Sequence, residues 1–110
     1  MEKIPFEELV VEQLEKATSA PSGRSSQTLY GGHEHRLRQT IIALSKGEGL
    51  DEHASPGEAT LLVLQGRVTF NVGSDSIDLE KGDYFIIPPE LHSVDAVDDS
   101  VILLSVSLPK

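Results

Sequence analysis

The residues of this chain best suited to chemistry are its four histidines, His33, His35, His53 and His92. Neutral imidazole nitrogens bind divalent metal ions and form hydrogen bonds to small ligands. The sequence contains no cysteine, which excludes disulfides and thiolate chemistry. It also lacks the Gly-x-Ser-x-Gly pattern of a nucleophilic serine and the Gly-x-x-x-x-Gly-Lys-Ser/Thr loop that holds phosphates. Any site is therefore expected around the histidines.

His53 lies in a stretch, Gly47 to Gly66, whose composition suits holding a side chain in place. A glycine-containing turn precedes the histidine, a Pro-Gly corner follows it, and an apolar run then ends at another glycine. Glycine and proline at such points are typical of the turns between strands. The stretch therefore predicts that His53 stands at the mouth of a β structure.

The chain from Leu37 onward has the pattern of a series of short strands. Apolar or alternating segments bounded by turn residues predict strands at residues 37–44, 59–64, 67–72, 76–79, 84–87, 92–94 and 101–108, with a turn over 45–51. A series of short strands with no helix between them indicates an all-β sandwich or barrel. Gln39 and Thr60 fall on these strands, where they could face the barrel interior and contact a ligand.

The first 36 residues form a different kind of segment. Residues 6–17 suit a helix, with Pro5 at its start, acidic residues in its first turn and apolar residues near one face. Residues 18–26 have the composition of a linker, and residues 27–35 end in the His33-Glu34-His35 triplet. We therefore expect residues 1–36 to be a helix and loop arm and residues 37–110 to be a barrel, within one structural domain.

The charge and hydropathy of the chain exclude several kinds of partner. The formal net charge is −9, from 18 acidic and 9 basic residues, whereas a phosphate backbone needs a basic face. No apolar run approaches the ~20 residues that cross a bilayer. The N-terminal residues also lack the basic start and apolar stretch of a signal peptide. We expect a soluble, cytoplasmic protein that binds neither nucleic acid nor a membrane.

The spacing of glycines, prolines and histidines resembles that of the cupins, small jelly-roll barrels with two diffuse motifs. The first motif, Gly-x5-His-x-His-x3,4-Glu-x6-Gly, is matched by Gly47, His53 and Gly66. The second, Gly-x5-Pro-x-Gly-x2-His-x3-Asn, is matched by Gly82, Pro88 and, one residue early, His92. The resemblance covers most of the chain from Leu37 onward. It implies an all-β double-stranded β-helix, the jelly-roll barrel of cupins, behind a short N-terminal helix.

The metal site that the resemblance implies is incomplete in this sequence. Cupins commonly hold one divalent ion, such as Zn, Fe, Mn or Ni, with three histidines and a glutamate. Only His53 and His92 remain, because Ser55 and Ala59 stand where the other histidine and the glutamate of the first motif would fall. Two imidazoles alone make a weak site for a divalent metal.

Two alternatives would supply a third donor. Glu58 lies beside the expected carboxylate position, although alternation along a regular strand would turn it to the other face. His33 or His35 could instead be delivered by the loop before residue 37, which would complete a three-histidine site with open positions.

These patterns favour a small cupin-like protein that binds a small molecule in its barrel, with a degenerate or weak metal site. The alternative is a metal-dependent oxygenase or isomerase, as the resemblance implies, using His53 and His92 with a histidine from 33–35. A structural subunit without a ligand is the third possibility, so enzyme activity stays open. The resemblance also implies a homodimer, which would cover the apolar helix face and the sheet edges.

Overall fold

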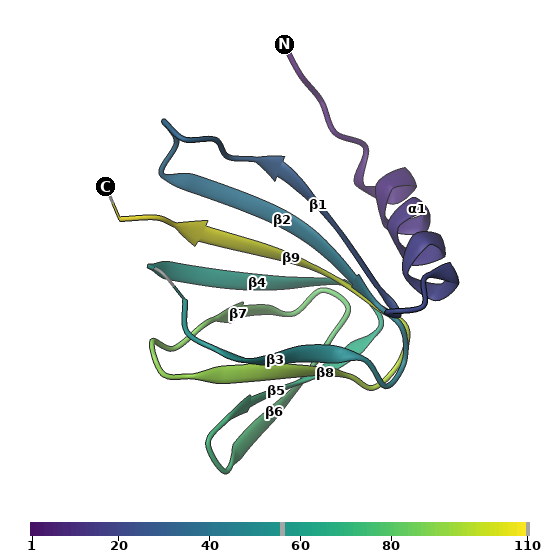
Figure 1. Ribbon diagram of the computed structural model, residues 1–110, viewed down its shortest axis with the longest axis vertical. Coiled ribbons are helices and arrows are strands. Elements are labelled where there is room, and N and C mark those ends of the chain that lie inside the picture. The colour runs from purple at the N-terminus through teal and green to yellow at the C-terminus, as the bar shows by residue number, and fades with distance from the viewer. Residues whose placement is uncertain (56, 110) are drawn as a thin grey trace.

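The computed structural model describes residues 1–55 and 57–109, and it contains one helix followed by nine strands in that part of the chain (Figure 1). The elements are α1 (Phe6–Ser19), β1 (Arg24–Tyr30), β2 (Leu37–Leu44), β3 (Gly49–His53), β4 (Glu58–Gln65), β5 (Arg67–Val72), β6 (Asp75–Glu80), β7 (Tyr84–Ile86), β8 (His92–Ala96) and β9 (Ser100–Ser107). The expected all-β fold with a short N-terminal helix is confirmed. No helix within the described residues has the length and apolar character needed to cross a membrane.

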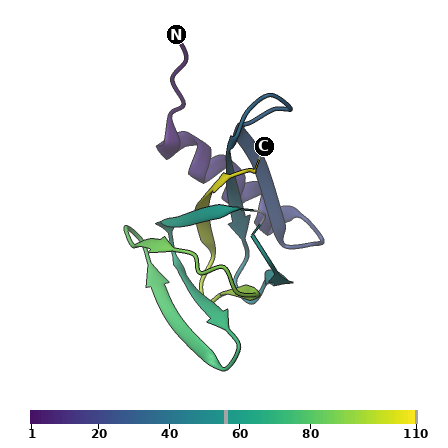
Figure 2. The same ribbon diagram turned by 90° about the vertical axis from the view of Figure 1, so that its left-hand side faces the viewer.

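The strands form two antiparallel sheets. The five-stranded sheet has the order β1-β2-β9-β4-β7, and the four-stranded sheet has the order β3-β8-β5-β6. In Figure 1 the five-stranded sheet lies above the four-stranded one, and Figure 2 shows the same two layers from the side. Apolar side chains from both sheets fill the space between them, including Leu44, Leu61, Val68, Phe70, Val94 and Ile102. Each such side chain contributes about 1.5–3 kcal/mol when it is fully buried.

Helix α1 covers part of the outer face of the five-stranded sheet. Leu9 and Ala17 pack there against Ile41, Ala43 and Val101, since alternate residues of β2 and β9 point away from the barrel interior. The helix ends at Ser19, slightly beyond the predicted residues 6–17.

A buried amide fixes the position of this helix on the sheet. Gln13 is 1% exposed, and its Nε2 donates a hydrogen bond to Oε1 of Gln27 at 3.0 Å. Its Oε1 accepts a hydrogen bond from the Ser25 hydroxyl. Both polar ends of the glutamine are therefore satisfied by β1, which avoids the penalty of an unpaired buried polar group.

The structure corrects the expected linker at residues 18–26 and loop at 27–35. Residues 24–30 form β1, which pairs with β2 along its length. Its sequence, Arg-Ser-Ser-Gln-Thr-Leu-Tyr, is mostly polar because β1 is an edge strand with little apolar burial. The expected turn at 45–51 likewise contains the start of β3, whose residues are largely exposed. Both strands were missed because strand patterns in sequence depend on burial.

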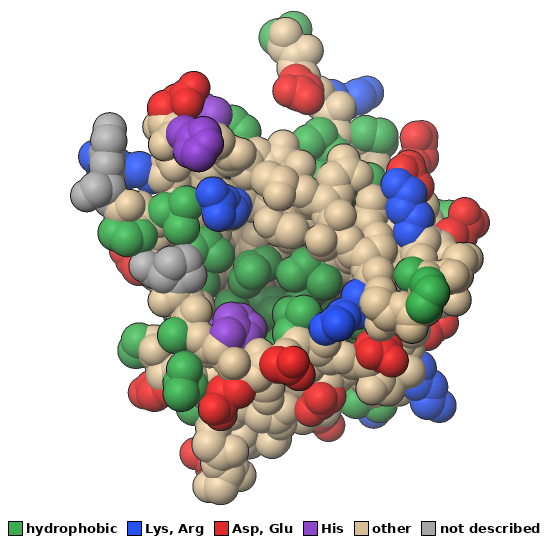
Figure 3. Space-filling model, viewed as in Figure 1, with side chains coloured by type: hydrophobic (Ala, Val, Ile, Leu, Met, Phe, Trp, Pro, Cys, Tyr) green, Lys and Arg blue, Asp and Glu red, His purple; other side chains and the backbone are tan. Residues whose placement is uncertain are grey.

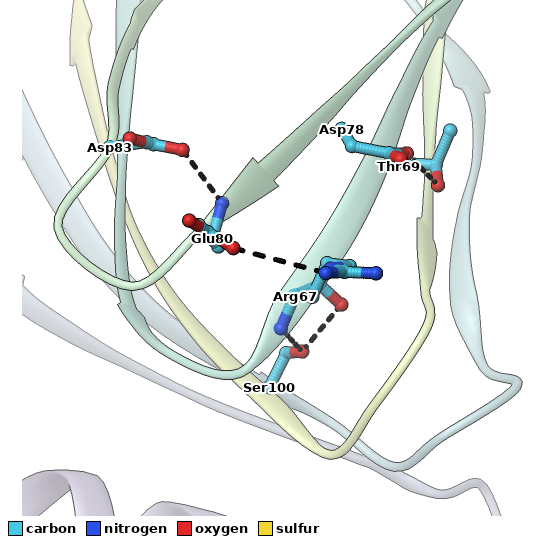
Figure 4. Close-up of polar contacts among 6 residues, drawn as sticks. All are labelled: Arg67, Thr69, Asp78, Glu80, Asp83 and Ser100. Carbon is cyan, nitrogen blue, oxygen red and sulfur yellow. Dashed lines mark hydrogen bonds and ion pairs between the residues drawn. The ribbon is translucent and has the colours of Figure 1, made fainter.

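A tight corner connects the two sheets. Gly66 alone separates β4 from β5, and its φ of +80° suits glycine. Beside it, the buried Ser100 hydroxyl oxygen accepts the Arg67 N–H at 3.0 Å and lies 2.9 Å from the Arg67 carbonyl oxygen (Figure 4). The Asp83 carboxylate accepts the Glu80 N–H at 2.9 Å at the next turn. These contacts hold the corner with backbone partners, so its geometry does not depend on exposed ion pairs.

Candidate functional site

The structure brings His53 and His92 together. The two residues are direct partners in the pairing of β3 with β8. Their ring centroids are 4.5 Å apart, with the ring planes at 68°. Two residues separated widely in the sequence thus form one imidazole pair, as the motif spacing predicted.

A bulge in β3 directs His53 toward this partner. Leu50 pairs with Val94 and His53 pairs with His92, so β3 advances three residues while β8 advances two. Leu50 and His53 therefore lie on the same face, although regular alternation would place residue 52 there. The extra residue is what allows the histidine to join the inner face of the sheet.

Each ring is held by a backbone carbonyl two residues before it. Nδ1 of His53 lies 2.7 Å from the Asp51 carbonyl oxygen, and Nδ1 of His92 lies 2.9 Å from the Glu90 carbonyl oxygen. A carbonyl oxygen only accepts hydrogen bonds, so Nδ1 must carry the proton in both rings. The neutral form of each imidazole therefore presents Nε2 as a hydrogen-bond acceptor or as a ligand.

The two rings differ in their surroundings. His92 is 2% exposed and stacks on Phe70 with ring centroids 5.0 Å apart. Phe70 in turn packs on Phe85 at 4.6 Å. His53 is exposed to solvent. A ligand would therefore meet His53 first, with His92 behind it against an aromatic wall.

A hollow between the two sheets lies along the inner face of β3, the face that also carries His53. It has a volume of about 350 Å³ and is lined by residues of β1, β2 and β3, including Arg24, Thr40, Ile42 and Leu50. Figure 3 shows a floor of hydrophobic side chains here, with a histidine at one side and a basic side chain at the other. The volume is within the range of small-molecule pockets.

The structure has two larger depressions. One, of about 940 Å³, lies between the N-terminal residues and the β1–β2 hairpin and is lined by Tyr30, His35 and Gln39 among others. The other, of about 610 Å³, is lined by Thr60, Ile86 and neighbouring residues. We base the candidate site on the smaller hollow because Leu50, which lines it, lies on the same inner face of β3 as His53.

Gln39 and Thr60 do not line the barrel interior, which corrects their expected orientation. Gln39 has the same strand parity as Ile41, which packs beneath α1. Thr60 alternates with the buried core residues Ala59 and Leu61. Both therefore lie on the outer face, where Gln39 Nε2 donates a hydrogen bond to the Ser105 hydroxyl at 3.1 Å. The predicted orientation of these two side chains was wrong because the sequence does not show which face of the sheet the helix covers.

The other candidate donors lie elsewhere. His35 stacks on Tyr30 with ring centroids 4.6 Å apart, and His33 is exposed in the same loop. Glu58 is exposed and shares the outward parity of Thr60. None of these three described residues joins His53 and His92 in a group of donors placed to hold a metal ion.

Comparison with known proteins identifies the family. The model of the Cupin domain family matches residues 40–107, which is more than half of the chain. The chain belongs to the cupin family. Among curated proteins, none matches it.

Solved structures similar to this cupin share its fold. A conserved protein of unknown function from Streptococcus pyogenes is 25% identical, with a TM-score of 0.73, over 86% of this chain and 85% of that one. An RmlC-like cupin from Shewanella frigidimarina is 25% identical, with a TM-score of 0.70, over 84% and 82%. KdgF from Halomonas sp. is 19% identical, with a TM-score of 0.68, over 84% and 85%. These likenesses support the jelly-roll barrel inferred from the strand order.

The residues present do not fit the divalent metal that cupins often bind. Within residues 1–55 and 57–109, no group of three or more His, Asp or Glu side chains is placed to hold an ion. The interior position expected for the carboxylate is Ala59, whose side chain belongs to the apolar core. A site for a divalent metal generally needs at least three protein donors, and here there are two imidazoles. We therefore propose no reaction that depends on a bound metal.

Sequence reasoning missed Arg24, Thr40 and Leu50 of the hollow. Arg24 lies in a segment that resembled a linker, and Leu50 lies in one that resembled a turn. Their position depends on the pairing of β1 with β2 and of β3 with β8. The sequence offered one signal for Thr40. Because side chains alternate along a strand, Thr40 points to the face of β2 opposite to that of Ile41, which the helix covers.

Proposed function

We propose that this cupin binds a small molecule in the hollow between its sheets, with the His53–His92 pair as the polar anchor. The observation that carries the proposal is the arrangement of the two rings. They are 4.5 Å apart, and each has its Nδ1 bound to a backbone carbonyl. Both Nε2 atoms are thus positioned before a ligand arrives, which reduces the entropy lost on binding.

The surroundings of the pair offer a ligand apolar contacts beside the polar side chains of β1. Ile42 and Leu50 line the hollow, and Phe70 supports His92 from the core. Pockets of this kind combine an apolar lining with a few polar groups that orient the ligand. The histidines would supply orientation, and the aliphatic side chains would supply contact area.

A metal-dependent oxygenase or isomerase is the weaker proposal, since it needs a third donor beside the two rings. A structural subunit without a ligand would make the hollow and its histidines incidental. Both alternatives are outcomes of the same experiment.

The proposal is tested by titrating ¹⁵N-labelled protein with a set of small apolar amines, alcohols and acids at millimolar concentration. We expect at least one class to shift the amide signals of Thr40, Leu50 and His53. His53→Phe, which keeps a ring but removes the nitrogens, should weaken this binding. His33→Phe, at an exposed loop position, is the matched control and should leave it unchanged. Shifts confined to other surfaces, or none at all, would contradict the proposal.

A further inference from the structure

We infer that the polar end of the ligand is a hydrogen-bond donor, and specifically a protonated primary amine on a compact apolar body. This inference rests on the proposed function and names the ligand class of that site. It follows from the tautomer of the two histidines and from the charges at either end of the hollow.

The histidine pair presents acceptors to the hollow. Because Nδ1 of each ring donates to a backbone carbonyl oxygen, the neutral rings have only Nε2 left, and Nε2 then lacks a proton. A carboxylate is itself acceptor-only and would face these nitrogens without a hydrogen between them. An ammonium group has three donors and no acceptor, so it matches one or both rings.

The charged side chains beside the histidine pair also favour a positively charged ligand. Asp51 and Glu52 belong to β3 immediately before His53, and Glu90 lies two residues before His92; all three are exposed. Figure 3 shows acidic side chains along the rim of the hollow next to the histidine. With a formal net charge of −9 on the chain, the potential at this rim attracts cations.

The basic residue of the hollow lies at its other end. Arg24 lines the hollow, and its Nη1 donates to the Gly49 carbonyl oxygen at 3.2 Å. Gly49 begins β3 and His53 ends it, so the length of the strand separates the arginine from the histidine pair. An acid that entered the hollow would be drawn to Arg24, and its binding would not depend on His53.

The test compares three ligands of one shape: benzylamine, benzyl alcohol and benzoate. Their binding to the intact chain is followed by amide shifts, with His53→Phe and Arg24→Gln as the two variants. We expect benzylamine to bind most tightly, and His53→Phe to weaken it by about tenfold or more, since a hydrogen bond to a charged group contributes about 1.5–3 kcal/mol. Arg24→Gln removes a positive charge from the lining of the hollow, so it should not weaken the binding of the benzylammonium cation.

The outcomes separate this inference from the proposal on which it rests. Benzoate binding more tightly than benzylamine, with dependence on Arg24 and none on His53, would overturn the amine assignment while keeping a ligand in the hollow. Equal binding of all three, unaffected by His53→Phe, would also overturn it, because shape alone would then explain the affinity. Absence of any shift at Thr40, Leu50 or His53 would contradict the proposed function itself. His53 is exposed, so its replacement tests binding without risk to the core.

Discussion

The imidazoles of His53 and His92 stand 4.5 Å apart at 68° on neighbouring strands. The cupin resemblance expects two of its four metal ligands at these histidines, and Ser55 and Ala59 occupy the positions at which it expects the other two. Ala59 is buried on the inner face. The two missing donors can be restored experimentally.

Restoring the donors should create a metal site. We expect Ser55→His combined with Ala59→Glu to give stoichiometric Zn²⁺ uptake, because four protein ligands complete a tetrahedral site. Zinc at about 100 times its dissociation constant should then stabilise the variant by about 2.7 kcal/mol, measured as a rise in melting temperature. The unchanged chain should show no comparable rise at the same zinc concentration. Adding His53→Phe to the double variant is the control, and uptake that survives it would contradict the proposed geometry.

Much of the fold could be predicted from the sequence because strands that are buried have a recognisable pattern of apolar residues. Residues 59–64 and 67–72 alternate or run apolar and form the interiors of β4 and β5. The strands that were missed, β1 and β3, are mostly exposed. These strands are held in the fold mainly by hydrogen bonding to a neighbouring strand, and strand pairing is only weakly visible in a sequence.

The candidate site was predictable only in part, for a related reason. The motif spacing identified His53 and His92, but the bulge that turns His53 inward depends on the register of β3 against β8. The orientation of Gln39 depended on where α1 would pack, and the sequence shows an amphipathic helix without its partner face. Residue types and their spacing can thus identify candidate site residues. The residues that line the hollow can be identified only from the tertiary structure.

The amide beneath α1 gives a stability prediction. Gln13→Ala should lower the free energy of unfolding by about 1–3 kcal/mol, because it removes a buried amide together with its two hydrogen bonds to Gln27 and Ser25. Urea denaturation monitored by circular dichroism measures the change. Glu12→Ala is the matched control one residue earlier. It removes only an exposed contact with Lys16 and should change stability by less than about 0.5 kcal/mol. Equal effects of the two substitutions would show that the amide does not hold the helix.

The corner between the sheets gives a second stability prediction. Gly66→Ala should be strongly destabilising, because a Cβ there would lie 2.3 Å from the Asp99 carbonyl oxygen as well as at a positive φ. Gly73→Ala has a positive φ of +59° but no heavy atom within 4 Å of the added Cβ. It should cost only about 1–2 kcal/mol of backbone strain. Thermal denaturation of the two variants separates crowding from backbone strain, and similar losses would contradict the crowding at Gly66.

The expected homodimer can be tested on the outer face of the five-stranded sheet. Beyond α1, this face presents the uncharged side chains of Thr60, Leu62, Tyr84, Ile86, Leu103 and Ser105, with the exposed Glu58 at their edge, at the start of β4. Tyr84 and Ile86 are 64% and 74% exposed. Two chains that each carry a net charge of −9 repel one another least where they meet through an uncharged surface, so we expect a second copy of the chain to cover this patch.

Ile86→Arg should therefore convert a dimer to a monomer, because it places an unpaired charge within the expected contact. Light scattering coupled to size-exclusion chromatography gives the mass of each form. Ile77→Arg is the matched control, since Ile77 is also an exposed isoleucine on a strand, 47% exposed, but lies on the four-stranded sheet. A monomer for the unchanged chain would contradict the expected homodimer. A dimer that persists in Ile86→Arg, or is lost in Ile77→Arg, would place the interface on another surface.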